Sequence, residues 1–291
     1  MAAVRRVGKR HKKLNRSAAG TFFLIAITTF FGIFMIMPMV YSVSTALKPL
    51  DELWTFPPQF FVQNPTLKNF SDLIRLMSSS TVPFARYIFN TVFISVVGTA
   101  GNVLISSMCA YGISKLKVRG SNVMFQMVVL ALMFNGTVTA IPGFLVIRAF
   151  GWINSYAAVI VPAFAAPLGL YLMKQFMEQM VPDTLLEAAR IDGASEYTIF
   201  FKIVMMIVKP AWLTLIIFTF QSLWSLSSSV YIYDEQLKTF SYALSQILAG
   251  GIARAGAGAA AAVVTLLVPM IVFIISQSNV VETMATSGMK D

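Results

Sequence analysis

Apolar and polar positions form long alternating blocks along this chain rather than the short stripes of a soluble helix. A helix needs about 20 mostly apolar residues to cross the hydrocarbon core of a bilayer. Six runs have that length and character: residues 21–47, 87–113, 122–147, 154–173, 211–233 and 257–280. The pattern therefore predicts an all-α fold, an integral membrane helical bundle with six transmembrane helices.

Charged and turn-forming residues mark the boundaries of these runs. Lys48-Pro49 ends the first run, and a basic loop at 115–120 separates the second from the third. Prolines remove helical hydrogen bonds, so kinks or breaks are expected in the third and fourth runs, at Pro142, Pro162 and Pro167. The predicted division is a basic tail at 1–20, a first transmembrane helix at 21–47, an external loop at 48–84 with a short helix around 67–77, a five-helix core at 85–280 that includes a polar loop at 182–210, and a second tail at 281–291.

Composition and charge support a membrane location and give an orientation. The chain has 291 residues, of which 57% are hydrophobic and 12% charged, whereas a soluble domain carries about 25% charged residues. The net charge of +10 does not indicate nucleic acid, because the excess Lys and Arg lie beside the apolar runs. With a cytoplasmic N-terminus, six spans place most of the 22 Lys and Arg inside, as the positive-inside rule requires. Both tails and the 182–210 loop are then cytoplasmic, and the basic tail can touch anionic membrane lipid.

The residue types that are missing narrow the function. The six runs contain no Asp, Glu, Lys, Arg or His, which disfavours a proton- or charge-coupled carrier. The single histidine, His11, lies in the basic tail, so neither an HExxH zinc site nor a Ser-His dyad exists. The sequence also lacks a GxxxxGK[ST] phosphate loop. We expect a protein that is not an enzyme, has no catalytic residues, metal or cofactor of its own, and takes any driving energy from another subunit.

The loop at 182–210 is the most informative segment. Thr184 and Glu187 have the spacing of a capping box, Gly193 supplies a left-handed stop, and Ser195 can cap a second helix. The pattern predicts a short helix, a tight turn and an amphipathic helix that leads to Pro210. An element of this kind can bind a partner and transmit its movement. The alternative is an ordinary amphipathic loop helix.

The stretch from Glu187 to Pro210, EAARIDGASEYTIFFKIVMMIVKP, resembles the EAA signature of binding-protein-dependent ABC importer permeases. Asp192 before Gly193-Ala194 is similar to the carbohydrate branch of that family. Further likeness to the maltose-type (MalG-like) permeases covers most of the chain, at residues 44–49, 90–91, 110–111, 115–120 and 288–290. The sequence departs from the family at Met205-Met206, where Leu-Pro is usual, which predicts a straighter helix there.

The resemblance implies a type I ABC importer permease in a prokaryotic plasma membrane. Such a chain pairs with a homologous second permease, two ATP-binding subunits that hold ATP and Mg, and an external sugar-binding protein that delivers the sugar. By resemblance, the ATPase-coupling residues are Glu187, Ala188, Ala189, Asp192 and Gly193. The outer segment 234–256 corresponds to a loop that reaches the binding protein in maltose-type relatives, and its glycines suggest flexibility.

Candidates for the substrate path are neutral polar and aromatic residues in or beside the apolar runs: Asn135, Gln221, Trp224, Ser225 and Tyr231. Aromatic faces suit sugar rings, but Trp and Tyr near span ends also serve as interfacial anchors. Three other functions stay open at this point. They are an ABC permease for amino acids or peptides, an ion-coupled secondary carrier, and a membrane scaffold that transports nothing.

Overall fold

The computed structural model describes residues 18–78, 82–134, 136–227 and 230–287. Within these ranges the chain is helical, with no strand. The helices are α1 Ala18–Leu47, α2 Leu50–Leu53, α3 Lys68–Ser78, α4 Phe84–Ser114, α5 Ser121–Met133, α6 Gly136–Ala149, α7 Ala157–Phe164, α8 Pro167–Met180, α9 Asp183–Ile191, α10 Glu196–Thr198, α11 Met205–Ile207, α12 Lys209–Trp224, α13 Phe240–Ala249 and α14 Ala255–Ser287.

The predicted all-α membrane bundle is confirmed, with corrections to two spans. Four segments are long and apolar enough to cross a membrane: 19–47, 84–114, 157–180 and 255–277. The number rises to six if each of two bent helix pairs counts as one span. The third run forms α5 and α6, which are bent by 115° relative to each other, and α6 begins at Gly136, a residue type that favours turns. The fifth run is helical only as far as Trp224.

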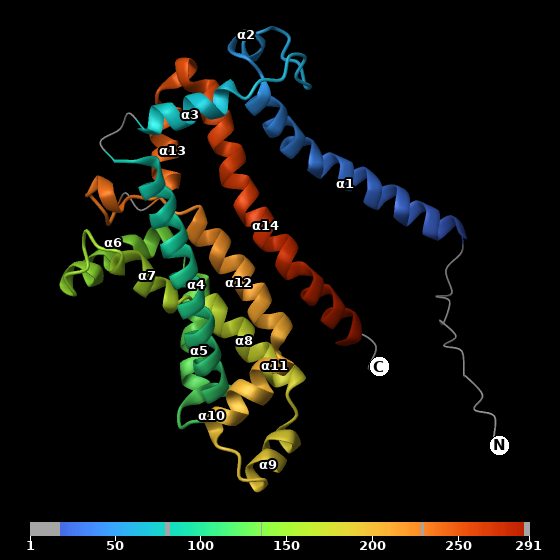
Figure 1. Ribbon diagram of the computed structural model, residues 1–291. Coiled ribbons are helices and arrows are strands. Elements are labelled where there is room, and N and C mark those ends of the chain that lie inside the picture. Colours follow the sequence, from blue (N-terminus) through green and yellow to red (C-terminus); the bar gives the residue numbers. More distant parts are fainter. Residues whose placement is uncertain (1–17, 79–81, 135, 228–229, 288–291) are drawn as a thin grey trace, which may run out of the picture.

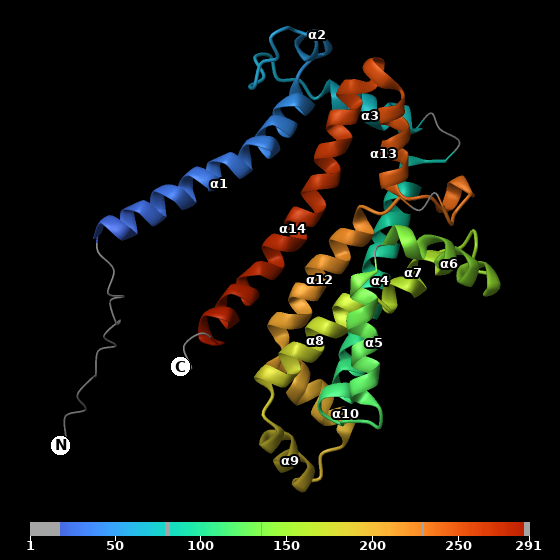
Figure 2. The same ribbon diagram turned by 180° about the vertical axis from the view of Figure 1, so that it is seen from behind.

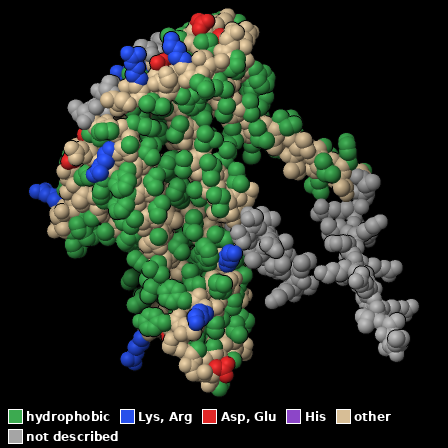
Figure 3. Space-filling model, viewed as in Figure 1, with side chains coloured by type: hydrophobic (Ala, Val, Ile, Leu, Met, Phe, Trp, Pro, Cys, Tyr) green, Lys and Arg blue, Asp and Glu red, His purple; other side chains and the backbone are tan. Residues whose placement is uncertain are grey.

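The long helix α4 lies at the centre of the bundle (Figure 1). It packs against α7, α8 and α12, and α12 also packs against α14. The C-terminal end of the first helix, α1, contacts α14, whereas the N-terminal end of α1 lies away from the bundle (Figure 2). Most of α1 is therefore exposed in the single chain. The side of the molecule shows a broad apolar surface, with most charged side chains towards the two ends (Figure 3).

Three groups of buried side chains form the core. One lies at the end of the bundle that carries α9, here called the α9 end, and includes Tyr111, Leu186 and Phe200. A second lies at the opposite end, here called the α13 end, where Phe240 and Ile247 pack against α3, α4 and α14. The third lies between them and joins α4, α7 and α12. The helix expected near 67–77 is confirmed as α3.

Two prolines inside spans are compensated by side chains of neighbouring helices. Pro167 has no N–H for the carbonyl of Ala163, four residues earlier, and the Nδ2 of Asn102 on α4 donates to that carbonyl instead, at 2.8 Å. Pro269 likewise leaves the carbonyl of Thr265 without a helical donor. The indole Nε1 of Trp224 donates to it at 3.0 Å. Lipid offers no donors, so these bonds satisfy groups that would otherwise be unpaired.

The two predicted tails differ in how far the structure describes them. Of the basic tail at 1–20, residues 1–17 fall outside the described residues, and 18–20 already belong to α1. At the other end, the last helix does not stop at 280. It continues as α14 through Ser287, so most of the predicted tail at 281–291 is helical.

Candidate functional site

The start of α9 differs from the predicted capping box. The helix begins at Asp183, after Pro182, and no side chain caps it. Thr184 is therefore the second helical residue rather than the cap. Proline fixes its own φ and precedes the helix in extended conformation. The negative charge of Asp183 in the first turn still interacts favourably with the positive end of the helix dipole.

The end of α9 agrees with the prediction. Gly193 has φ +80°, a conformation that suits glycine. Its N–H donates to the carbonyl of Arg190, and the N–H of Ala194 donates to that of Ala189, both at 3.0 Å. This pair of bonds is the Schellman arrangement. Beyond the turn, Ser195 Oγ accepts from the N–H of Thr198 at 3.3 Å, which confirms Ser195 as the cap of the next helix.

α9 turns one face inward and leaves the other free. Leu186 is 1% exposed and packs in the core of the α9 end. Ala189, predicted to contact a partner, is half-buried and packs against the same core. The other predicted coupling residues are exposed: Glu187, Ala188, Asp192 and Gly193. Ile191 beside them is 86% exposed. The free surface thus combines an exposed isoleucine, small residues and carboxylates.

Two basic residues just after α4 bind the beginning of α9. The Nζ of Lys115 donates to the carbonyl of Val181 at 2.6 Å and to Asp183 Oδ1 at 2.7 Å. Lys117 Nζ lies 3.5 Å from Asp183 Oδ2. The hydrogen bond from Lys115 is the main reason that the pKa of Asp183 lies below its usual 3.8. These contacts fix the N-terminal end of α9 against α4.

A second polar cluster binds the end of α9. Glu196, in α10, accepts from Arg190 Nε at 2.6 Å through one carboxylate oxygen. Its other oxygen accepts from the hydroxyl of Tyr111 on α4, also at 2.6 Å. The carboxylate raises the pKa of the Arg190 guanidinium. Neither cluster was predicted from the sequence, although the four-residue spacing of Tyr111 and Lys115 indicates one helix face.

The segment that leads from α10 to α12 is not the straighter helix predicted from Met205-Met206. Residues Ile199–Val204 form a π-helical turn. The axis then bends by 79° between Ile207 and Lys209. The bend follows from Pro210, which cannot donate a backbone hydrogen bond. Trp212 Nε1 donates to the carbonyl of Met205 across the bend, at 3.0 Å.

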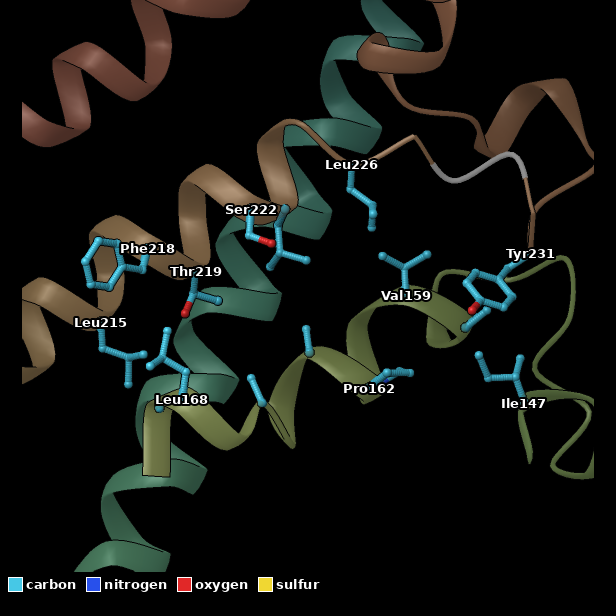
Figure 4. Close-up of a pocket in the computed structure, with 15 residues that line it drawn as sticks. Ile147, Val159, Pro162, Leu168, Leu215, Phe218, Thr219, Ser222, Leu226 and Tyr231 are labelled. Carbon is cyan, nitrogen blue, oxygen red and sulfur yellow. The ribbon is translucent and has the colours of Figure 1, made fainter. Parts of the chain in front are cut away.

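The candidate path residues lie in different environments. Tyr231 lines a cavity of about 320 Å³ between α7, α8 and α12, into which Thr219 and Ser222 also point (Figure 4). Gln221 and Ser225 line a separate cavity of about 520 Å³ between α12, α14 and Met39 of α1. Trp224 is 2% exposed and holds the Thr265 carbonyl, so its indole N–H is engaged in helix packing. Asn135 lies outside the described residues.

The outer segment 234–256 is more ordered than its glycines indicate. Residues 240–249 form α13, which buries Phe240, Ala243 and Ile247. The spacing of these three residues is that of one helix face. The flexible loop predicted for the whole segment is therefore wrong for this helical part.

An apolar bundle with several candidate spans defines the class of multi-pass membrane proteins, and the exposed helix-turn-helix at one end offers a surface to a partner. Comparison with known proteins then identifies its family. The chain belongs to the family of binding-protein-dependent transport system inner membrane components, whose model matches residues 102–285. These proteins are the permeases of ABC importers rather than enzymes, as the EAA resemblance predicted. The ion-coupled carrier is disfavoured accordingly.

Similar proteins extend the match over most of the chain. The polygalacturonan/rhamnogalacturonan transport system permease protein YtcP of Bacillus subtilis is 29% identical over 220 residues, 75% of this chain and 74% of that protein. The arabinooligosaccharides transport system permease protein AraQ of the same species is 25% identical over 282 residues, 95% and 99% of the two chains. A crystal structure of a bacterial ABC transporter that imports alginate has a TM-score of 0.76 at 21% identity, covering 91% and 99%. That structure supports the fold.

Proposed function

We propose that this chain is the membrane-spanning permease subunit of an ATP-driven sugar importer and that its substrate is an oligosaccharide. It forms half of the translocation path and couples to the ATPase through α9. The observation that carries this proposal is the exposed face of α9, with Glu187, Ala188, Asp192 and Gly193 free. The printed functions of YtcP and AraQ, and Asp192 in the EAA segment, support a carbohydrate substrate.

The partners follow from surfaces that one chain leaves uncovered. On the α9 side, exposed Ile191 and Glu187 offer an apolar contact and a carboxylate to an ATP-binding subunit. A homologous second permease would complete the path and cover apolar surface that otherwise faces lipid. The full assembly would have two ATP-binding subunits, which bind ATP and Mg, and an external sugar-binding protein on the α13 side. ATP-driven closure of the ATPase pair would turn the path outward, and hydrolysis would return it inward.

The orientation rests on the charge distribution. The α9 end carries Lys115, Lys117 and Arg119 beside the coupling segment, and the tail before α1 holds seven further Lys and Arg: Arg5, Arg6, Lys9, Arg10, Lys12, Lys13 and Arg16. The positive-inside rule places such groups in the cytoplasm. In a prokaryotic plasma membrane, both tails and α9 would therefore lie on the cytoplasmic side, and α3 and α13 on the external side.

Two cavities are candidates for the path. The first carries the hydroxyls of Thr219, Ser222 and Tyr231 in an otherwise apolar wall. The second carries Gln221 and Ser225. Hydroxyl and amide groups bind sugar hydroxyls without binding cations strongly, and no charged residue lines either cavity. Both cavities border α12, so movement of α12 would change them together.

Uptake and purification together test this function. Deletion of the gene in the source organism should abolish uptake of at least one radiolabelled oligosaccharide from a panel of galacturonan and arabinan fragments. A plasmid copy should restore that uptake. The affinity-tagged chain should also retain an ATP-binding protein and a second permease during purification in mild detergent. Unchanged uptake of every fragment, or purification without any ATPase, would contradict the proposal.

A further inference from the structure

The segment that carries α9 is held against the bundle by more than the chain that enters and leaves it. Tyr111 and Lys115 lie four residues apart at the end of α4, on one face. Lys115 reaches the residues at the beginning of α9, and Tyr111 reaches the cluster at its end. Leu186, in the middle of α9, packs in the same buried core as Tyr111. α9 is thus linked to the end of α4 in three ways: directly through Lys115, through Glu196 of α10 by way of Tyr111, and through the buried core that contains Leu186.

Three separate links fix the orientation of α9 relative to α4, whereas a single contact would allow α9 to rotate about it. The Lys115 side chain is 6% exposed and Tyr111 is 4% exposed, so water competes little at the α4 side of each contact. Hydrogen bonds to charged groups are roughly twice as strong as neutral ones. The exposed partner, Lys117, has a side chain that is 71% exposed and contributes little by comparison.

The other end of α4 binds the outer segment just as closely. Asn90 Nδ2 donates to the carbonyls of Gln236 and Lys238, each at 2.8 Å. Thr91 Oγ1 accepts from the N–H of Phe240 at 2.8 Å. A continuous helix of 31 residues therefore joins the coupling segment to residues 235–240 across the bundle.

We propose that Tyr111 and Lys115 are positioning residues that clasp α9 to α4, so that the two helices move as one rigid body. This inference rests on the proposed function, because it assigns the route by which the ATPase acts. A displacement of α9 then moves α4 directly, and α4 carries it to the outer segment at 235–240. The bent connection through α10, α11 and α12 is a second, longer route.

Distance measurements between the two helices test the clasp. Cys109 is exposed on α4 and accepts a spin label, and Thr184→Cys provides an exposed site on α9. The labelled chain is purified with its bound ATPase. We expect one narrow distance distribution in the native chain, with the same mean with and without ATP, Mg²⁺ and vanadate. In the double variant Lys115→Met with Tyr111→Phe, the distribution should widen about twofold or more, and its mean should change with nucleotide.

Matched variants separate the clasp from a general loss of structure. Lys174→Met removes a lysine whose side chain is 13% exposed and whose ion pair with Glu178 stays within α8. Tyr171→Phe removes a hydroxyl from the same helix. Both should keep the narrow distribution, and Lys115→Arg should restore it beside Tyr111→Phe. A double variant that folds and matches the native chain in width and nucleotide response would overturn the clasp.

A second label tests transmission to the far side. A fluorophore at Gln246→Cys, exposed on α13, is read in a Cys109→Ser background. The nucleotide-dependent signal should fall about fivefold or more in the double variant, while the bound ATPase continues to hydrolyse ATP. An unchanged signal would overturn the route through α4. A chain that retains no ATPase would instead contradict the proposed function, while the nucleotide-free distance distribution would still test the clasp.

Discussion

The two ends of α4 hold their neighbouring segments with different chemistry. At the α13 end, Asn90 and Thr91 are completely buried and bind main-chain groups of residues 236–240. At the α9 end, Tyr111 and Lys115 bind side-chain carboxylates that are about half exposed, Glu196 and Asp183, and only Lys115 also binds a main-chain carbonyl, that of Val181. Buried bonds to the backbone depend only on the fold, whereas half-exposed charges also respond to solvent and to a partner. The α13 end is therefore held by the fold alone and is called here the fixed joint. The clasp at the α9 end holds α9 rigidly only while its charged groups keep their partners, and is called here the adjustable end.

Asn90→Leu should have the largest effect, because it breaks the fixed joint. The change leaves the carbonyl of Lys238 without its donor and removes two further hydrogen bonds, to the carbonyl of Gln236 and from the hydroxyl of Tyr156, both of which also contact Arg86. One unsatisfied buried group costs about 1–3 kcal/mol, and each further lost hydrogen bond about 0.5–1.5 kcal/mol, so the loss should be about 2 kcal/mol or more. Thermal unfolding in detergent measures it. Asn122→Leu, at an exposed position of α5, is the control and should change the midpoint little.

Gly193→Ala should have a smaller effect, confined to the adjustable end. A left-handed conformation costs an L-residue about 1–2 kcal/mol. Gly112→Ala is the matched control, since that glycine lies in α4 with no atom near a new Cβ. It should be neutral or slightly stabilising. Hydrogen exchange of α9 measures the local loss, and equal protection in both variants would show that the turn is not strained.

Glu187→Lys should leave the fold unchanged and remove function. Glu187 is exposed on the free face of α9, and surface substitutions usually change stability by less than about 0.5 kcal/mol. Reversing the charge should weaken binding of the ATPase, which co-purification and ATP-dependent uptake measure. Asp51→Lys, on the far side of the bundle, controls for charge alone. Native uptake by Glu187→Lys would place the docking surface elsewhere.

A change of pH near neutrality should have the smallest effect on the contact between α9 and α4. The folded-state pKa of Asp183 is lowered by Lys115 to below 3.8, so its contribution to stability is present above that value and is lost only as the pH falls through the lowered one. The width of the α4–α9 distance distribution should therefore be constant from about pH 5 to pH 8. The hydrogen bond from Arg190 likewise lowers the pKa of Glu196, so widening within that range would contradict the assignment of these two carboxylates to the clasp.

Local features of the fold were predictable from the sequence, and long-range contacts were not. The stop at Gly193 and the cap at Ser195 depend on neighbouring residues and were found. The cap at Thr184 was wrong because Pro182 and Asp183 already set the helix start. Trp224 was predicted as a path residue from its aromatic ring, and its hydrogen bond to the Thr265 carbonyl was not predicted because that group lies 41 residues away. Helix α13 was missed although the spacing of Phe240, Ala243 and Ile247 indicates it.

The amide of Asn102 that binds the Ala163 carbonyl has a mechanical consequence. Helices α7 and α8 meet just before Pro167, where the break in the span can act as a hinge. Any swing that carries the carbonyl beyond reach of that amide leaves a bare acceptor in lipid, at a cost of several kcal/mol. The side chain of Asn102 on α4 thus limits the change of angle between α7 and α8: small changes keep its hydrogen bond, and large ones break it.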